Sequence, residues 1–234
     1  MGSSHHLKRI AMPRSWPLPR KTTVWVTRPR AGGHALNRCM ALGVVLRDVI
    51  GVAHSSREAR VILHDGAVQI DGRIVRDIRQ GVGLMDVLTL GEQNYRCVLD
   101  ERGKLRYRPI SKKDAAWKPC RIENKTTIKG GLTQLNLHDG RNIIVEDGSL
   151  YSTRDTLRIS LPEQKILDHI PFTDGASVYL TGGSHVGATA AIKESITTRS
   201  SMPNEIVFDE FSTIEDHVFI IAKKTPLPGI EVSA

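Results

Sequence analysis

The chain has 234 residues, of which 40% are hydrophobic and only 5% aromatic, with 20 glycines, 11 prolines and a formal net charge of +8. This length can bury a sizeable core, and the many turn-forming residues favour several small modules. An apolar run of about 18 residues is missing, which excludes a membrane-spanning helix, and the basic start lacks the apolar stretch of a secretory signal. We therefore expect a cytoplasmic protein.

The three cysteines are Cys39, Cys97 and Cys120. Their odd number and wide spacing fit neither a disulfide framework nor a zinc site built from paired thiolates. Because free cysteine behaves as a small hydrophobic residue, we expect all three to be reduced core residues. We expect neither a metal nor a cofactor.

The positive charge is concentrated at one end of the chain. Nine of the 33 Lys and Arg residues precede Asp48, which is the first acidic residue. The remaining 24 are balanced by the 25 Asp and Glu residues, so the N-terminal fifth carries the excess. A segment with so many like charges repels itself and favours a polyanionic partner.

Residues 1–33 are predicted to form an extended, basic arm. Its prolines disfavour helix at the residues before them, and Gly32-Gly33 closes the segment. Trp16 and Trp25 lie among the basic residues. Such tryptophans suit either stacking on nucleotides or docking on the protein's own surface, and the sequence does not choose between the two.

Two short helices and a hairpin are predicted next. Apolar residues at spacings of three and four predict an amphipathic helix over 34–50. A second helix follows Ser55, which forms a capping box with Glu58, and ends at Gly66. The alternating segment AVQIDGRIV predicts a hairpin with Asp71-Gly72 at its tip, and MDVLTL predicts the strand that follows.

This succession of elements, over residues 34–95, resembles the αL RNA-binding motif first known from bacterial ribosomal protein four. In that family the helices present a basic face to structured RNA. The resemblance implies four matching donors, which are Arg57, Arg60, Arg73 and Arg76. On charge alone, the same arginines fit an ordinary solvated surface.

Short strands and turns dominate the middle of the chain. Hairpins are predicted around Arg102-Gly103 and in DTLRISLPEQKILDHI. Gly130-Gly131, Asp139-Gly140 and Asp147-Gly148 mark further turns. Because no helical period persists, residues 96–175 are predicted to form a small β domain.

Residues 176–234 resemble the KOW motif, a small five-stranded β-barrel. A strand, a glycine-containing loop and a second strand beginning near Thr189 follow its pattern, with Gly187 at the position of the hallmark glycine. The same loop contains Gly182 and Gly183. NEIVFDEF and HVFIIAKK are predicted closing strands, and LPGIEVSA is a predicted tail.

Catalytic motifs are missing, and we expect neither enzymatic activity nor a small-molecule substrate. TGGSHVG lacks the Gly-Lys-Ser/Thr ending that cradles phosphates, and it precedes a strand rather than a helix. Two His-Asp-Gly tripeptides, at His64 and His138, end in turn-making glycines, which favours a structural role over metal binding. The Gly-Arg-Leu-Asp signature of pseudouridine synthases is reduced to Gly140-Arg141-Asn142-Ile143, which lacks the aspartate.

The order of the modules resembles one family, the archaeal and eukaryotic small-subunit ribosomal proteins usually called S-four-e. HLKRIAMPRSWPLPRK, GLMDVLTL and KGGLTQLNLHDGRNI carry the match most specifically, and it extends from His6 to about Ile221. The length is typical of an archaeal member. His5 and His6 are then interpreted as native, whereas Met1–Ser4 fit either a native start or a cloning remnant.

The resemblance implies a mixed α+β, mainly β structural protein with a basic arm and three modules. It implies binding to small-subunit ribosomal RNA beside neighbouring ribosomal proteins, without membrane contact. Candidate RNA contacts in and after the arm are Lys8, Arg9, Arg14, Trp16, Arg20, Lys21, Arg28, Arg30 and Arg38. Those in the β domain are Lys125, Lys129, Gly130, Gly131, His138, Arg141 and Asn142. The glycines serve either close approach of RNA or the turns themselves.

The sequence leaves two other functions open. One is an RNA-modifying enzyme of the pseudouridine synthase type, since many such enzymes carry an αL motif. The other is a KOW-bearing transcription factor. The first lacks its catalytic aspartate, and the second leaves the αL motif and the basic arm unexplained.

Overall fold

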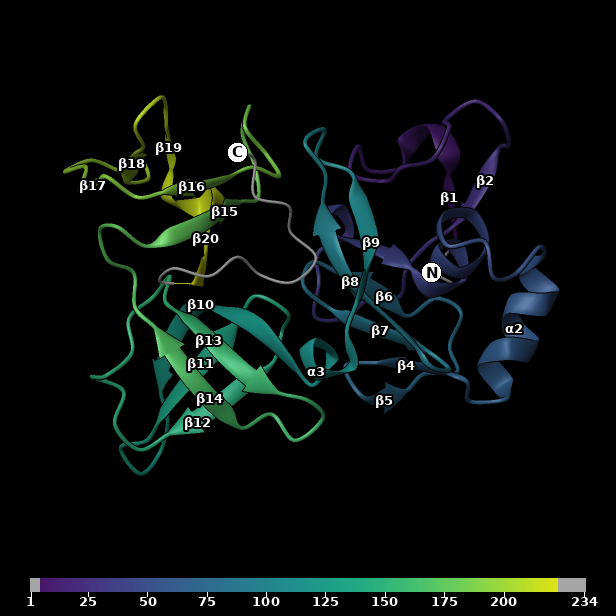
Figure 1. The fold of residues 1–234 in the computed structure, drawn as a ribbon, viewed down its shortest axis with the longest axis horizontal. Helices are drawn as coiled ribbons and strands as arrows, with labels where there is room; N and C mark the ends of the chain where they lie inside the picture. Colours follow the sequence, from purple (N-terminus) through teal and green to yellow (C-terminus); the bar gives the residue numbers. More distant parts are fainter. Residues whose placement is uncertain (1–4, 223–234) are drawn as a thin grey trace. The chain divides into compact units, whose positions relative to one another are not determined.

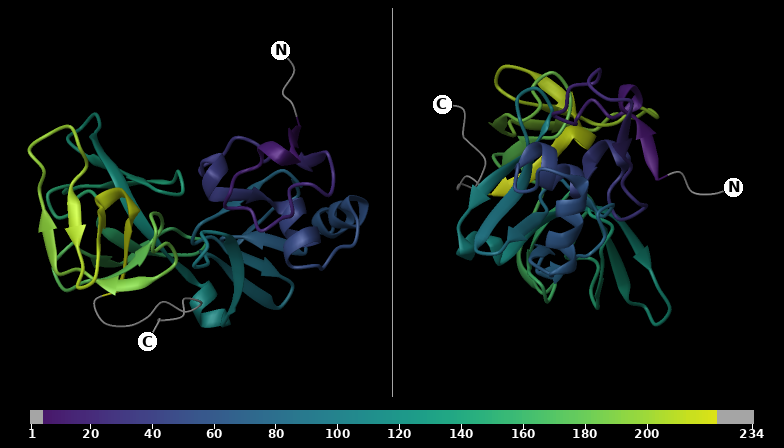
Figure 2. Two further views of the ribbon diagram at one scale, coloured as in Figure 1. Left: turned by 90° about the horizontal axis from the view of Figure 1, so that it is seen from above. Right: turned by 90° about the vertical axis from the view of Figure 1, so that its right-hand side faces the viewer.

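The structure, a computed structural model, describes residues 5–222 (Figures 1 and 2). It is mainly β with a few short helices, which confirms the predicted class, and no helix within residues 5–222 is long and apolar enough to cross a bilayer. The chain forms two compact units. The first contains the chain up to Leu99, Lys104–Lys118 and Leu161–Glu163, and the second contains Asp100–Gly103, Pro119–Ser160 and the chain from Gln164 onward. Met1–Ser4 and the predicted tail lie outside the described residues.

An antiparallel sheet of order β5-β4-β7-β8-β9 lies at the centre of the first unit. Its strands are β4 (Val68–Ile70), β5 (Arg73–Ile74), β7 (Val87–Leu90), β8 (Gln93–Leu99) and β9 (Leu105–Ile110). Asp71 and Gly72 join β4 to β5 with φ angles of 52° and 76°. Left-handed values at both central residues belong to a two-residue hairpin turn. The predicted hairpin and the strand after it are confirmed.

Helix α2 (Ser56–His64) belongs to the same unit (Figure 1). The Ser55 hydroxyl accepts a hydrogen bond from the backbone N–H of Glu58 at 3.1 Å, as the capping box predicts. The Glu58 carboxylate accepts from the N–H of His54 at 2.8 Å, one residue before the expected donor. Gly66, at φ 74°, follows the last turn in the left-handed region. The second predicted helix is therefore confirmed.

The first predicted helix is wrong over its N-terminal half. Leu36–Arg38 form the 3-10 turn η2, and Cys39–Ala41 form strand β3, which pairs with β6 (Gly81–Gly83). Helical structure begins with α1 (Leu42–Val44) and continues as the π-type turn η3 (Val45–Val49). All three residues of β3 are buried. A short apolar run that is buried on both sides has no period that distinguishes a strand from a helix.

The predicted extended arm is also wrong, because the segment is folded onto the first unit (Figure 2). Strand β1 (His6–Lys8) pairs with β2 (Trp25–Thr27), and the 3-10 turn η1 (Arg9–Ala11) follows β1. Trp16 is fully buried, and its indole N–H donates to the carbonyl of Cys39 at 2.8 Å. Four apolar side chains of the segment join the core, namely Met12, Trp16, Leu18 and Val26. Docking on the protein itself is thus the role of Trp16 in the fold.

A second sheet, of order β12-β11-β10-β13-β14, forms part of the second unit. Its strands are β10 (Trp117–Thr127), β11 (Thr133–Leu137), β12 (Asn142–Val145), β13 (Thr156–Ser160) and β14 (Ile166–Ile170). One apolar cluster lies on this sheet and consists of Cys120, Ile122, Leu135, Leu137, Leu157 and Ile159. The β13–β14 hairpin confirms the one predicted in DTLRISLPEQKILDHI.

Six short strands follow in the second unit. Strand β15 (Ser177–Leu180) lies between β16 (Thr189–Ala191) and β20 (Val218–Ala222). Strands β17 (Glu194–Ile196), β18 (Glu205–Val207) and β19 (Ser212–Ile214) form another small sheet, and the 3-10 turn η4 (Glu215–His217) precedes β20. Both sheets contribute to one apolar cluster that includes Val178, Ile206 and Ile220. The strand predicted to begin near Thr189 is confirmed.

Two arginines join the central sheet of the second unit to its last strands. Arg121 in β10 is buried and donates to the carbonyls of Asp216 and Val218 at 2.9 and 2.8 Å. Arg154 pairs with Glu123 at 3.1 Å and also with the Asp216 carboxylate. Since β20 also packs against β13 and β14, these charge-assisted hydrogen bonds hold the two groups of strands together.

Two details differ from the predicted middle of the chain. The boundary predicted between residues 95 and 96 falls inside β8, so the sheet of the first unit continues through it. A helical turn, α3 (Lys112–Ala115), lies in the range predicted to hold only strands. Ser111 caps this turn by accepting from the Asp114 N–H at 3.2 Å. A turn of four residues is too short to leave a helical period in a sequence.

A buried lysine connects three segments of the first unit. The ammonium of Lys118, at the start of β10, lies 2.7 Å from the Asp71 carboxylate and 2.9 Å from the Asp86 carboxylate. Asp86 also lies 2.9 Å from the His34 ring and accepts from the N–H of Gly83 at 2.8 Å. Burial by itself raises the pKa of Asp86, but the charges of His34 and Lys118 and these hydrogen bonds together hold it far below its usual range.

The three cysteines are free thiols in the core. Cys39, Cys97 and Cys120 are each at most 2% exposed. Burial, with a smaller contribution from the charge of Asp86, raises the pKa of Cys39 to about 11. Burial also raises the pKa of Cys97. The predicted reduced core cysteines are confirmed.

Gly83 provides a test of close packing in the first unit. A Cβ at this position would lie 2.3 Å from the His34 ring, so the ring would have to move away from Asp86. We expect Gly83→Ala to lower the free energy of unfolding by about 1–3 kcal/mol. Gly32→Ala is the matched control, because nothing lies within 4 Å of its added Cβ. Urea unfolding followed by tryptophan fluorescence measures both variants, and equal losses would contradict the packing argument.

Asp86→Asn tests the buried ion cluster. We expect this variant to lower the free energy of unfolding by about 3–5 kcal/mol, because the buried ammonium of Lys118 then has only one carboxylate partner. The folded pKa of Asp86 is depressed, so its carboxylate stabilises the fold above its unfolded pKa of about 3.9, and this stabilisation is lost as the pH falls. Wild-type stability should therefore decrease more steeply on acidification than that of the variant. Thermal unfolding at a series of pH values measures this pH dependence, and Asp174→Asn, at an exposed position, is the control. Parallel stability profiles for the wild type and Asp86→Asn would refute the prediction.

Candidate nucleic-acid interface

The four arginines of the predicted αL motif are exposed. Arg57 and Arg60 lie three residues apart on α2 and therefore share a face. Arg73 is in β5, and the Arg76 guanidinium lies within 3.9 Å of the position that a Cβ would take at Gly66. None of the four side chains has a hydrogen-bond or ion-pair partner among residues 5–222. Exposed, unpaired guanidinium groups are suited to binding phosphates.

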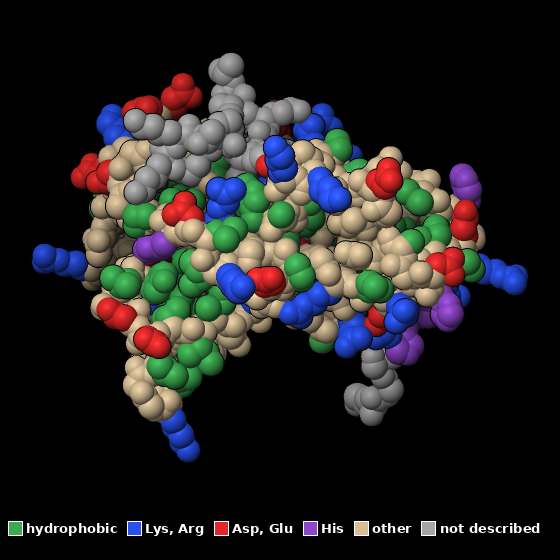
Figure 3. Space-filling view, turned by 60° about the horizontal axis from the view of Figure 1, so that its bottom comes forward, with side chains coloured by type: hydrophobic (Ala, Val, Ile, Leu, Met, Phe, Trp, Pro, Cys, Tyr) green, Lys and Arg blue, Asp and Glu red, His purple; other side chains and the backbone are tan. Residues whose placement is uncertain are grey.

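Acidic side chains are interspersed with basic ones on the surface. On the face drawn in Figure 3, Lys and Arg stand singly or in small groups, with Asp and Glu between them. The excess positive charge therefore forms no continuous patch on this face. Contacts with a polyanion there would be made by separate groups of bases rather than by one broad surface.

The N-terminal candidates divide into exposed and internally bonded side chains. The exposed ones are Lys8, Arg14, Lys21, Arg28, Arg30 and Arg38. Arg9 is 7% exposed, and its guanidinium donates to the Pro19 carbonyl at 2.6 Å and to the Thr23 hydroxyl at 2.9 Å. Arg20 is half-buried and donates to a backbone carbonyl at 2.8 Å. The predicted RNA contacts of Arg9 and Trp16 are corrected by the structure, because Trp16 is in the core and Arg9 is buried on Pro19 and Thr23.

Six of the seven candidates of the β domain lie at the two ends of one strand pair, and Lys125 lies between these ends, opposite Leu135. β10 and β11 are paired from Thr127 opposite Thr133 at one end to Ile122 opposite Leu137 at the other. Lys129, Gly130 and Gly131 are in the loop at the first end, and His138, Arg141 and Asn142 are at the second end. The five residues of β11 separate the two groups by about 17 Å. They therefore form two separate sites rather than one.

The side chains of this domain differ in their availability. Lys125 is exposed, but its ammonium donates to the carbonyls of Gly148 and Tyr151 at 3.0 and 2.5 Å. Lys129 and Asn142 are exposed, and neither side chain has a partner among residues 5–222. These two are the candidates here whose polar groups are available to a ligand.

The candidate glycines serve backbone geometry and close packing. Gly130 and Gly131 have φ angles of 90° and 77°, which other residues rarely adopt. Gly183 and Gly187, in the loop between β15 and β16, have φ angles of 82° and 84°. A Cβ at Gly187 would lie 2.6 Å from neighbouring backbone, and one at Gly182 would lie 2.5 Å from a histidine ring. The turns and the packing account for all five glycines.

Three side chains of the second unit lie close enough together to hold a metal ion, namely Cys120, His138 and Asp139. They are bonded to protein groups instead. The Cys120 thiol donates to the Asp139 carboxylate at 3.7 Å, and Arg141 pairs with the same carboxylate at 3.2 Å. His138 accepts a hydrogen bond from a backbone N–H at 3.2 Å. Because the Arg141 guanidinium already compensates the Asp139 carboxylate, we conclude that this cluster stabilises the turn after β11. This is the structural role predicted for Asp139.

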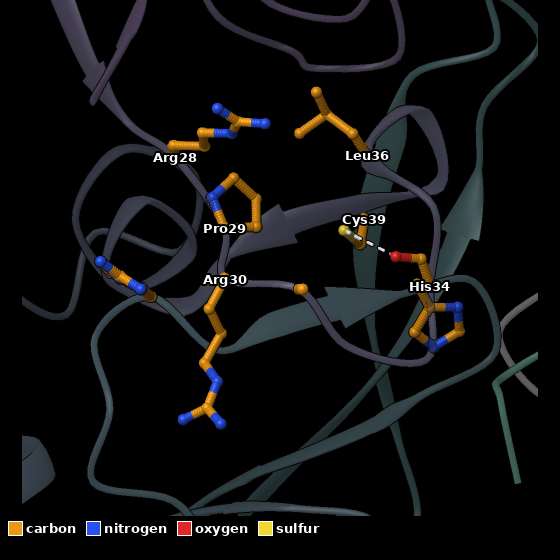
Figure 4. A pocket seen from close by; sticks show the side chains of 8 residues that line it. Arg28, Pro29, Arg30, His34, Leu36 and Cys39 are labelled. Carbon is orange, nitrogen blue, oxygen red and sulfur yellow. Dashed lines mark hydrogen bonds between the residues drawn. The ribbon is translucent and has the colours of Figure 1, made fainter. Parts of the chain in front are cut away.

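A basic pocket of about 290 Å³ lies in the first unit, and no sequence pattern predicts it. Its lining residues are Arg28, Pro29, Arg30, Ala31, His34, Leu36, Cys39 and Arg79. Figure 4 shows the Arg28 guanidinium directed toward Leu36, whereas the Arg30 side chain points away from it. Arg79 is far from the other lining residues in sequence, and it joins them because β3 pairs with β6. Spacing along the chain could not have identified it.

Other basic residues are buried and belong to the fold rather than to an interface. They are Arg96, Lys118 and Arg121. Arg96 donates to the carbonyls of Asp114 and Trp117 at 2.9 and 2.8 Å, and its guanidinium lies 4.8 Å from the centroid of the Trp117 ring. Some of the basic residues therefore stabilise the interior of the protein, and only their burial distinguishes them from the basic residues on the surface.

Comparison with known proteins finds similarity along almost the whole chain. Residues 91–166 match the model described as Ribosomal family S4e, and residues 1–37 match the RS4NT (NUC023) domain. The small ribosomal subunit protein eS4 of Methanothermobacter thermautotrophicus is 43% identical over 239 residues, which covers 98% of each chain. The eS4 protein of Methanocaldococcus jannaschii is 41% identical over 240 residues and 97% of each chain.

A solved structure has the same fold. The crystal structure of the 30S ribosomal protein S4e from Thermoplasma acidophilum aligns with a TM-score of 0.71 at 35% identity, over 79% of this chain and 95% of that one. Similarity of sequence over nearly the full length and similarity of fold thus lead to the same proteins. The chain belongs to the S4e family of ribosomal proteins.

Proposed function

We propose that this chain is a structural constituent of the small ribosomal subunit that binds and stabilises folded ribosomal RNA. The observation that carries the proposal is the division of its basic side chains into two kinds. Buried bases such as Arg96 and Lys118 are bonded to protein groups. The exposed arginines of α2 and the β4–β5 region have no partners among residues 5–222. Relatives named as small ribosomal subunit proteins support the same function.

The physical basis is the affinity of separate cations for a phosphate backbone. Each Lys or Arg that reaches a phosphate releases condensed counterions, so a dozen scattered bases give strong and salt-dependent binding. Arginine adds a planar, bidentate geometry that suits clustered phosphates. Folded RNA is recognised largely by shape and backbone. Binding of this kind does not need a single broad basic surface.

The proposal keeps four parts of the chain, residues 1–33, 34–95, 96–175 and 176–234, as regions of RNA contact and not as folding units, because residues 1–33 pack on the first unit and the 95/96 boundary lies inside β8. The first part presents its exposed bases from a folded surface, since it packs on the first unit. Linked contacts on one RNA raise the effective concentration of one another. The partners we propose are small-subunit ribosomal RNA and neighbouring ribosomal proteins, in the cytoplasm of an archaeon.

An RNA-modifying enzyme and a transcription factor are both disfavoured. The curated relatives named above are ribosomal proteins rather than modifying enzymes or transcription factors. The segment nearest to the pseudouridine synthase signature begins at Gly140 and lies in the turn after β11 and at the start of β12. Its Arg141 pairs with Asp139 and serves that turn.

Removal of two helix arginines tests the proposed RNA binding. We expect Arg57→Ala/Arg60→Ala to weaken binding to a small-subunit RNA transcript and to reduce the slope of log affinity against log salt. The slope should fall by about one for each phosphate that the variant no longer binds. Filter binding at several potassium chloride concentrations measures both quantities.

Lys112→Ala/Lys113→Ala is the control, since it removes the same charge from exposed positions of α3 that are not candidates. Its slope should stay closer to that of the wild type. Failure of the wild-type chain to bind the transcript, or to co-sediment with small subunits that lack it, would overturn the proposed function. Equal slopes for both double variants would remove α2 from the interface.

A further inference from the structure

The basic pocket of the first unit has features that general surface charge does not explain. Arg28 and Arg79 both line it, and neither side chain has a partner among residues 5–222. Arg30, the third arginine, is paired with Asp77 at 3.1 Å. The charge of Asp77 is thus compensated by Arg30, and the other two guanidinium groups remain uncompensated at a concave surface. Such an arrangement favours an anion.

Backbone hydrogen bonds fix the two segments of main chain that carry the unpaired arginines. The N–H of Arg30 donates to the carbonyl of Arg79 at 2.8 Å, which joins the two segments that carry the pocket's arginines. Asp77 accepts from the N–H of Arg79 at 2.9 Å through its other carboxylate oxygen. The N–H of Arg28 donates to the carbonyl of His5 at 3.1 Å. The main chain of the pocket is therefore preorganised, which lowers the part of the entropic cost of binding that comes from the backbone.

The other walls carry no negative charge toward a ligand. Cys39 has a pKa raised to about 11, mainly by burial, and is a neutral thiol near pH 7. The nearby Asp86 carboxylate is compensated by Lys118 and His34. Pro29 and Leu36 add apolar surface beside the arginines (Figure 4). A volume of about 290 Å³ is at the lower end of the range for ligand pockets.

We infer that this pocket receives a backbone phosphate of the bound RNA, held by the guanidinium groups of Arg28 and Arg79. The inference rests on the proposed function and adds Arg79, which no sequence signal identified. Two planar forks can each donate two N–H groups to phosphate oxygens. The apolar wall formed by Pro29 and Leu36 accommodates the adjoining sugar. RNA is favoured over a small anion because each of its phosphates is attached to a sugar. The phosphate matches the arginines of the pocket, and the sugar matches its apolar wall.

Paired variants of the full-length chain test the inference. We expect Arg28→Ala/Arg79→Ala to weaken binding to a small-subunit RNA transcript by about tenfold or more. The salt slope should fall by about two. Arg28→Lys/Arg79→Lys should keep most of the slope but lose affinity, because lysine keeps the charge without the planar fork. Arg102→Ala/Arg199→Ala removes two exposed arginines that do not line the pocket, and serves as the control.

An NMR measurement reports on the pocket directly and does not depend on the alanine variant folding. The side-chain Nε–H signals of Arg28 and Arg79 are assigned with the single lysine variants, and the wild-type chain is titrated with the transcript and, separately, with inorganic phosphate. We expect the transcript to shift both signals at concentrations where inorganic phosphate does not.

The outcomes separate the inference from the function on which it rests. A slope change no larger than that of the control, or unshifted arginine signals while RNA is bound, would overturn the pocket assignment and leave RNA binding intact. Signals shifted by inorganic phosphate but not by the transcript would show a free-anion site and also overturn it. A wild-type chain that binds no transcript would overturn the proposed function itself.

Discussion

The buried ammonium of Lys118 is the interaction on which the first unit depends. It lies between the carboxylates of Asp71 and Asp86, and each carboxylate also holds backbone. Asp71 accepts from the N–H of Val87 at 2.9 Å, and Asp86 accepts from the N–H of Gly83 at 2.8 Å. This ion cluster therefore connects the hairpin tip, the strands β6 and β7 and the start of β10. A buried charge without its partners is strongly unfavourable, so these segments keep a single arrangement.

This fixed centre determines how the exposed bases are presented. Arg73 follows the hairpin tip that Asp71 anchors, and α2 carries Arg57 and Arg60 while it buries Ala59 and Leu63. The guanidinium groups thus stand on elements that are rigid at their base. Binding a structured polyanion from such elements costs less conformational entropy than binding from a flexible segment. The N-terminal segment also presents its bases from an anchored backbone, because its Trp16 and Met12 are in the core while Lys8 and Arg14 are on the surface.

Arginine has two tasks in this protein, and burial separates them. Arg96 and Arg121 donate to carbonyl groups inside the fold, where the fork geometry satisfies several acceptors at once. Arg28 and Arg79 line a pocket without partners among the described residues. The same residue type therefore stabilises the interior and provides the interface. Net charge alone cannot assign a given arginine to either task.

The sequence by itself determined the features that a few neighbouring residues encode. The Ser55 cap, the Asp71-Gly72 hairpin and the short strands of the second unit follow from local hydrogen bonding and turn geometry. The resemblance of family-specific stretches also predicted the S4e family. Only the tertiary structure decided that Cys39–Ala41 form a strand, that the N-terminal segment is folded and that Arg79 shares a pocket with Arg28. These features depend on contacts between residues far apart in the chain, and local periodicity contains no information on which distant segments meet.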